Sequence, residues 1–235
     1  MGAKTIDVMK RYELKYVLTK EQVAFIKSRL VNHMELDEYG LTSIASLYYD
    51  TPDYRLIRAS IEDPEYKEKI RLRSYGLATK DSPLFLELKR KCESIVYKRR
   101  VKTNQKQTDA FFSGKQIEGE KQISKEIAYF RDFYKNLVPA CLIIYDREAY
   151  FEKDGDLRLT IDFNPRYRME DLNLTTSMDG ISLLNEGEAI LEIKVQEAMP
   201  LWLTHILAQG NIKKSSFSKY GTAYKREMSN MLAVA

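Results

Sequence analysis

The feature that most constrains the fold is a period-two alternation that places cationic side chains on one face of successive strand-like segments. In one segment Lys69, Arg71 and Arg73 alternate with Ile70 and Leu72. Because successive side chains of a strand point to opposite faces, the cations share one face and the apolar residues share the other. The same alternation recurs in segments 11–16, 86–89, 98–100, 145–149, 157–162 and 191–195. The chain therefore needs a sheet with one apolar face and one charged face.

The charged faces of these segments are strongly biased toward positive charge. Four carboxylates lie on them: Glu13, Glu87, Asp162 and Glu192. Eleven cations are assigned to them as well: Arg11, Lys15, Lys69, Arg71, Arg73, Lys89, Lys98, Arg100, Arg147, Arg158 and Lys194. Arg99 leaves open which of the three cations in 98–100 share this face. A sheet with one face in water shows the same alternation, but a solvated face usually mixes both signs. Like charges on neighbouring strands repel, so the excess of cations indicates a bound polyanion.

Curling of the sheet would bring the excess cations together. If the sheet curls into a barrel or tunnel, the cations converge on one lumen. Arginine suits a phosphate-type anion because its planar guanidinium matches phosphate oxygens. We therefore expect the cations to bind a polyphosphate-type anion, and the alternative is a solvated sheet face.

The order of the elements predicts an α+β fold. Strands are expected over 12–17, 43–49, 67–75, 83–90, 95–101, 141–151, 157–163 and 189–196. Helices are expected from Thr19, over 105–112 and 124–137, from Pro200 to before Gly210, and over 219–231. Thr19 and Gln22 match a capping box, and 165–187 is polar and irregular. Antiparallel strands with blocks of helices favour an antiparallel β-barrel or tunnel with helices packed outside. The 235 residues fit one domain over 1–235.

Several other classes of protein are poorly supported. Two cysteines and two histidines are too few for a disulfide framework, a zinc site or a credible Ser–His–Asp triad. The sequence contains no P-loop and no dinucleotide-binding glycine motif. No segment approaches the ~20 apolar residues of a membrane span, and no signal peptide precedes the first strand. We expect a cytoplasmic protein.

The four carboxylates divide into two expected roles. Glu13 and Glu87 are expected to form ion pairs with lumen cations. Phosphoryl-transfer sites also use Mg²⁺ or Mn²⁺, held by one or two carboxylates together with substrate oxygens. Glu192 and Asp162 are the candidates for this metal.

An ordered set of motifs resembles a known family. The segments Arg11-Tyr-Glu-Leu-Lys15-Tyr16 and Leu47-Tyr-Tyr-Asp-Thr-Pro-Asp53 resemble the opening of the CYTH, or triphosphate tunnel metalloenzyme, superfamily. Further motifs make the chain similar to the VTC domain, the catalytic part of the vacuolar transporter chaperone polyphosphate polymerases: 69–73, 86–91, 98–100, 145–147, 158–162, 191–194 and 217–220. The resemblance implies a tunnel of antiparallel strands lined by basic residues.

The resemblance also implies roles for single residues. Catalytic charge stabilisation is expected from Arg71, Arg73, Lys89 and Arg158. Substrate binding is expected from Arg11, Glu13, Lys15, Lys69, Lys98, Arg100, Arg147, Lys194 and Lys219. The metal, Mn²⁺ or Mg²⁺, is expected on Glu192, with Asp162 as the second candidate. The family pattern has a further lysine shortly before Lys219, where this chain has Ser215 and Ser216.

The expected function is that of a polyphosphate polymerase, which transfers the γ-phosphate of ATP to a growing polyphosphate chain. The expected partners are therefore ATP, triphosphate and polyphosphate, and coupling to transport would need a separate membrane protein. A triphosphatase or polyphosphatase and a non-catalytic polyphosphate-binding module are the alternatives. Nucleic acid is a weaker alternative, because no aromatic stacking residues are expected among the lumen cations.

Overall fold

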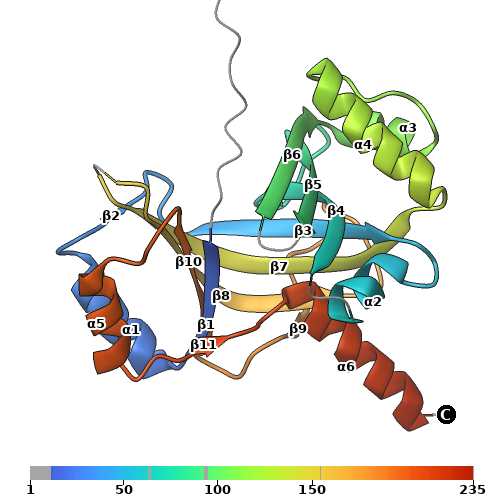
Figure 1. Cartoon of the computed structure of the whole chain (residues 1–235). Helices are drawn as coiled ribbons and strands as arrows, with labels where there is room; N and C mark the ends of the chain where they lie inside the picture. The colour runs from blue at the N-terminus through green and yellow to red at the C-terminus, as the bar shows by residue number, and fades with distance from the viewer. Residues whose placement is uncertain (1–11, 63–64, 93–94, 154, 235) are drawn as a thin grey trace, which may run out of the picture.

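The computed structural model describes residues 12–62, 65–92, 95–153 and 155–234. Within these residues the centre of the molecule is an eleven-stranded antiparallel sheet with the main order β11-β1-β10-β8-β7-β3-β4-β5-β6, in which β2 also pairs with β7 and β9 with β8 (Figure 1). The strands are β1 (Tyr12–Leu18), β2 (Glu35–Leu36), β3 (Thr42–Asp50), β4 (Tyr66–Tyr75), β5 (Leu84–Cys92), β6 (Ile95–Thr103), β7 (Val138–Phe151), β8 (Arg158–Arg168), β9 (Ile181–Ser182), β10 (Ala189–Val195) and β11 (Lys214–Ser215).

The helices lie in three groups around this sheet (Figure 1). Their bounds are α1 (Lys20–Leu30), α2 (Arg55–Glu62), α3 (Gln105–Phe112), α4 (Lys121–Tyr134), α5 (Leu201–Gln209) and α6 (Lys219–Val234). Helices α1 and α5 lie together at one end, α3 and α4 lie beside β5 and β6, and α2 and α6 form the third group. None of the helices in the described part of the chain is long and apolar enough to cross a membrane.

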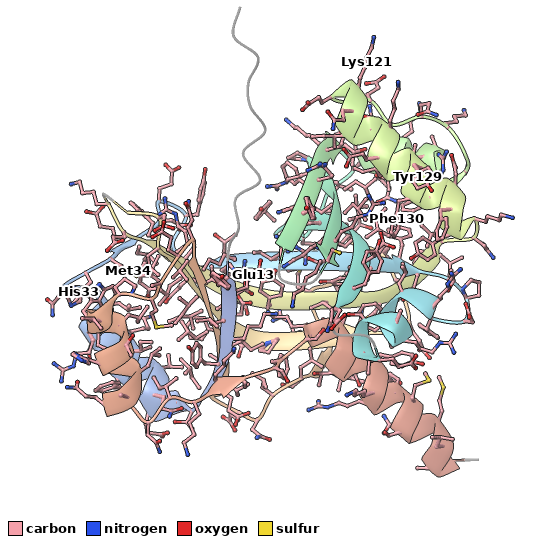
Figure 2. All side chains as sticks on the ribbon, viewed as in Figure 1. Glu13, His33, Met34, Lys121, Tyr129 and Phe130 are labelled. Carbon is pink, nitrogen blue, oxygen red and sulfur yellow. The ribbon has the colours of Figure 1, made fainter. Side chains whose placement is uncertain are left out.

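The apolar side chains of β4 and β5 are buried under α3 and α4. Leu72 and Leu86 are fully buried in one cluster with Phe111 and Phe130. Figure 2 labels Phe130 on α4 next to Tyr129, which is exposed. The alternation along the strands therefore turns the apolar residues outward against helices, and the cations inward.

The other half of the sheet repeats this arrangement with α1 and α5. Leu159, Leu191 and Ile193 are fully buried in a cluster with Ile26 of α1 and Leu203 of α5. The capping box predicted at the start of α1 is confirmed, because the Thr19 side chain accepts from the Gln22 backbone and the Gln22 side chain accepts from the Thr19 backbone. The α+β fold expected from the sequence is confirmed.

Two parts of the predicted element order were wrong. Helix α2 was not predicted, although it starts directly after the Asp50-Thr51-Pro52-Asp53 segment. Strand β8 continues past Pro165, where an irregular segment was expected. The β7–β8 ladder shifts register between Ile144 and Asp146, and Asn164 has a φ of 46°. This bulge lets proline occupy a strand interior, because proline has no N–H to donate to the ladder.

The sheet is curled, but it is not a closed barrel. Among the described residues β6 and β11 form its two ends, and no ladder joins them. The expected tunnel is therefore completed by side chains and by the segment before α6, rather than by backbone pairing.

Candidate functional site

Side chains from strands far apart in the sheet meet on the charged face, called the inner face below. Lys89 Nζ of β5 lies 2.6 Å from Glu13 Oε2 of β1, although five strands separate β1 from β5 in the sheet order. Figure 2 shows Glu13 near the centre of the molecule, beside β1. Lys15 Nζ donates to Phe217 O at 3.1 Å, and Lys69 Nζ donates to Ser218 Oγ at 3.1 Å. The segment 217–219 thus bridges the two halves of the curled sheet.

Glu87 organises the cations of β4 and β6. Its side chain is 1% exposed, and its Oε2 lies 2.8 Å from Arg71 Nη2 and 3.7 Å from Arg73 Nε. Its Oε1 lies 2.8 Å from Lys98 Nζ and 3.5 Å from Arg100 Nε. Burial raises the pKa of Glu87, but Arg71, Arg73 and Lys98 outweigh burial and hold it well below its ordinary value. The expected role of Glu87 as an ion-pair partner is confirmed.

Neighbouring hydroxyl groups fix the two arginines of β4 further. Arg71 Nη1 donates to Tyr48 OH at 2.8 Å. Arg73 Nη2 donates to Tyr145 OH at 3.1 Å, and Arg73 Nε donates to Ser46 Oγ at 3.3 Å. Both guanidinium groups are therefore pre-organised on the inner face.

Asp162 forms a second anionic centre. Arg147 donates to both of its oxygens, from Nε at 2.5 Å and from Nη2 at 2.8 Å. Lys219, the first residue of α6, also contacts Asp162 Oδ2. Burial raises the pKa of Asp162, but Lys219 and Arg147 outweigh burial and lower it to about 2. Asp162 therefore stays ionised and holds two cations.

Glu192 is less tightly held. Its Oε1 lies 3.0 Å from Lys194 Nζ, and its Oε2 lies 3.9 Å from Lys15 Nζ. Burial raises the pKa of Glu192, but the surrounding cations, Lys194 foremost, hold it well below its ordinary value. The Glu192 carboxylate is thus ionised, and among the described residues its Oε2 has only the long contact with Lys15.

Two titratable groups of the inner face have pKa values near neutrality. Burial, together with the neighbouring cations, lowers the pKa of Lys69 to about 7. Burial raises the pKa of Tyr145, but Arg147, Arg73 and Lys219 outweigh it and lower the value to about 8. Both shifts show that the inner face favours added negative charge.

The structure places the remaining predicted residues at the edges of the inner face. Lys98 and Arg100 face Glu87, whereas Arg99, between them, pairs with Glu126 of α4 on the outer face at 2.7 Å. Arg158 is exposed at the start of β8 and donates to Leu157 O at 3.1 Å. Its strand partner is Lys194. Arg11 lies outside the described residues.

Aromatic side chains do interleave with the cations, so the expectation that they are absent was wrong. The hydroxyl groups of Tyr48 and Tyr145 accept hydrogen bonds from Arg71 and Arg73 on the inner face. Tyr75 lies two residues after Arg73 on β4, and Phe85 is the strand partner of Arg73. The period-two pattern already contained this signal for Tyr75, because positions 73 and 75 share a face.

Asp50 and Tyr220, which lie in two of the sequence motifs, contact each other and position two helices. Buried Asp50 accepts from the backbone N–H groups of Leu56 and Ile57 at 2.8 and 3.0 Å, and so caps α2. The Tyr220 hydroxyl donates to Asp50 Oδ2 at 3.0 Å. Burial raises the pKa of Asp50 despite these bonds. The carboxylate thus anchors the start of α6, and with it Lys219.

A cavity of about 280 Å³ lies away from these cations, between the outer face of β4–β6 and α4. Its charged side chains are already paired, Arg90 with Glu68 and Arg99 with Glu126, each at 2.7 Å. The inner face, rather than this cavity, is the candidate functional site.

A curled antiparallel sheet with inward cations anchored on buried carboxylates defines the CYTH-like triphosphate-tunnel fold. The chain belongs to the VTC domain family, whose model matches residues 10–228. No curated protein matches the chain in sequence.

Solved structures with the same fold are distant in sequence. A candidate adenylate cyclase from Bacillus halodurans aligns with a TM-score of 0.56 at 14% identity, covering 89% of this chain and 96% of that chain. A candidate adenylyl cyclase from Hippeastrum with a dominant triphosphatase activity aligns with a TM-score of 0.54 at 15% identity, covering 88% and 92%. A candidate adenylate cyclase from Vibrio parahaemolyticus aligns with a TM-score of 0.50 at 11% identity, covering 92% and 98%. At these identities the likeness shows the fold alone.

Proposed function

We propose that this protein is a polyphosphate polymerase that uses ATP. A terminal oxygen of the polyphosphate chain would attack the γ-phosphorus, the bond to the β–γ bridging oxygen would break, and ADP would leave. The observation that carries the proposal is the pair of buried carboxylates, Glu87 and Asp162, each holding cations on the inner face. Such pre-organised cations suit phosphoryl transfer, in which positioning and charge stabilisation supply most of the catalysis.

The inner-face cations would divide this work. Arg71 and Arg73, fixed by Glu87 and by hydroxyl groups, would stabilise the negative charge of the transferring phosphoryl group. Lys89 would contribute from the neighbouring strand β5, and Arg158 from β8. The remaining cations would bind flanking phosphates: Arg11, Lys15, Lys69, Lys98, Arg100, Arg147, Lys194 and Lys219. Glu13 would hold Lys89, to which it is already bound at 2.6 Å.

A divalent cation fits Glu192 better than Asp162. Magnesium and manganese sites in phosphoryl-transfer proteins need only one or two protein carboxylates, because substrate oxygens supply other ligands. In the part of the chain that the structure describes, Glu192 Oε2 has only the 3.9 Å contact with Lys15, whereas Arg147 and Lys219 already occupy both oxygens of Asp162. We therefore propose Glu192 as the ligand and Asp162 as the residue that positions Arg147 and Lys219. A bound Mn²⁺ or Mg²⁺ would supply further neutralisation of phosphate charge.

Hydrolysis is the second candidate, because the Hippeastrum protein with the same fold has a dominant triphosphatase activity. Water would then replace the polyphosphate end as the acceptor. A protein that only binds polyphosphate would use the same cations without turnover. We keep a cytoplasmic location and a single domain as predictions.

Incubation of the protein with ATP and Mn²⁺ tests these candidates together. Polymerisation predicts long phosphate chains on a gel and an equivalent amount of ADP, whereas hydrolysis predicts free phosphate without chains. Glu192→Gln should abolish the metal-dependent product, and Glu186→Gln, at an exposed position before β10, is the matched control. Free phosphate as the sole product would overturn the polymerase proposal.

A further inference from the structure

At one end of the inner face Arg100 packs against two aromatic rings, which the phosphate-binding role proposed for Arg100 does not explain. The Arg100 guanidinium lies 3.8 Å from the centroid of the Phe85 ring, and its Nη2 donates to Tyr75 OH at 3.1 Å. The Tyr75 and Phe85 rings meet edge to face, with centroids 5.7 Å apart. We call Tyr75, Phe85 and Arg100 the aromatic cluster.

The aromatic cluster lies at the open end of the inner face. Along β4, Lys69 contacts Ser218 before α6, and Tyr75 lies six residues further, at the opposite end of the strand. Exposure rises in the same direction, from 6% at Arg73 to 47% at Tyr75. The cluster is therefore accessible from outside, while Arg73 behind it is buried.

The cluster is also continuous with the proposed phosphate site. Phe85 is the strand partner of Arg73, and Arg100 is the strand partner of Glu87. Tyr75 lies two residues, about 7 Å, beyond Arg73 along the strand. A ligand with a flat aromatic end and a phosphate tail could contact both at once.

We propose that the aromatic cluster binds the base of a nucleoside triphosphate, whose phosphates extend inward to Arg73 and Arg71. This inference rests on the proposed use of ATP and adds the site at which the base of ATP binds. Aromatic rings and an arginine plane stack on any base, because every base has a π-face. Only the Tyr75 hydroxyl and the Arg100 guanidinium offer hydrogen bonds, so the site selects for the presence of a base and discriminates weakly among bases.

A second aromatic–arginine pair serves as the matched control. The Arg158 guanidinium lies 5.5 Å from the centroid of the Phe151 ring, also on strand ends far from the Lys219 contact. This pair has one ring instead of two, and Arg158 is tied to Glu152 O and Leu157 O of its own hairpin. The aromatic cluster is therefore the better binding site for a base.

Calorimetric titration with ATP and with tripolyphosphate separates the base from the phosphates. In the unchanged protein both ligands should bind, and ATP should bind more tightly than tripolyphosphate. Tyr75→Leu and Phe85→Leu should each weaken ATP binding by about 5- to 150-fold, the range expected for the loss of one stacking ring, and leave tripolyphosphate binding unchanged. Phe151→Leu should change neither affinity.

Each contrary result has a distinct meaning. Equal losses of ATP and tripolyphosphate affinity in Tyr75→Leu and Phe85→Leu, or no loss at all, would overturn the base site, and so would a selective loss in Phe151→Leu. Failure of both ligands to bind the unchanged protein would instead refute the proposed function. A 5′-triphosphorylated dinucleotide should bind no more tightly than ATP, and much tighter binding would show an RNA end as the ligand, against the mononucleotide assignment.

Discussion

Replacement of Glu87 by Gln removes the negative charge that holds four inner-face cations together. The change keeps the size of the side chain, which is 1% exposed and contacts Arg71, Arg73, Lys98 and Arg100. Loss of one partner from a buried ion pair lowers the free energy of unfolding by about 3–5 kcal/mol. With a urea m-value of ~2 kcal/mol/M, the unfolding midpoint should fall by about 2 M.

Glu126→Gln is the matched control for this measurement. Glu126 pairs with Arg99 at 2.7 Å on the outer face and is 27% exposed, and surface pairs of this kind contribute about 0–1 kcal/mol. Urea unfolding of both variants should therefore show a large loss for Glu87→Gln and a small one for Glu126→Gln. Equal losses would refute the role of Glu87 as the centre of the cation cluster.

Tripolyphosphate should narrow the difference in stability between Glu87→Gln and the unchanged protein. Its oxygens can supply the negative charge that the variant has lost, so the ligand should stabilise the variant more than the unchanged protein. A difference that stays the same at saturating tripolyphosphate would mean that the anion does not reach these cations.

The pH dependence of the same difference gives an independent check. The pKa of Glu87 is lower in the folded protein than in the unfolded chain, where it is about 4.3. The stabilisation is therefore complete above that unfolded-state value and is lost as the pH falls below it toward the folded-state pKa. The two proteins should converge in stability in acid, and a difference that grew as the pH fell would contradict the assignment.

Three further predictions concern the anion. The melting temperature should rise most with tripolyphosphate, less with pyrophosphate and least with orthophosphate. The free energy of unfolding should increase by about 2.7 kcal/mol when the ligand is in hundredfold excess over its Kd. A response no larger than that to sodium chloride at matched ionic strength would argue for a solvated face. A bound anion favours the protonated form of Lys69, whose pKa is about 7 in the absence of the anion. Calorimetry at pH 8 in buffers of different ionisation enthalpy should therefore show proton uptake on tripolyphosphate binding. Lys69→Met should reduce this uptake, and any remaining uptake is expected from Tyr145. Arg71→Ala and Arg158→Ala should each weaken tripolyphosphate binding by about 1.5–3 kcal/mol. Arg29→Ala, at an exposed position of α1, should leave this binding unchanged. Similar losses at all three positions would indicate diffuse electrostatic attraction.

Local periodicity was sufficient to predict which side chains share the inner face. Lys69, Arg71 and Arg73 alternate with buried Ile70 and Leu72 as predicted, because side-chain direction along a strand depends only on position. The capping box of α1 was predictable for the same reason, since its two residues are three positions apart. Pro165, in contrast, suggested the end of a strand, and only the bulge between β7 and β8 shows how the strand continues past it.

The contacts that make a site out of this face depend on the curl of the sheet. The run of three cations did not show which of Lys98, Arg99 and Arg100 face inward. The pairing of Arg100 with Glu87 in the β5–β6 ladder and the ion pair of Arg99 with Glu126 on the outer face decide this. The pairing of Glu13 with Lys89 joins residues 76 positions apart in the chain. The sequence alone determined the sign of each charge and, outside the run 98–100, the face on which it lies, because the direction of a side chain along a strand follows from local backbone geometry. Only the tertiary structure decided which charges meet, because strand order and curl arise from packing between distant segments.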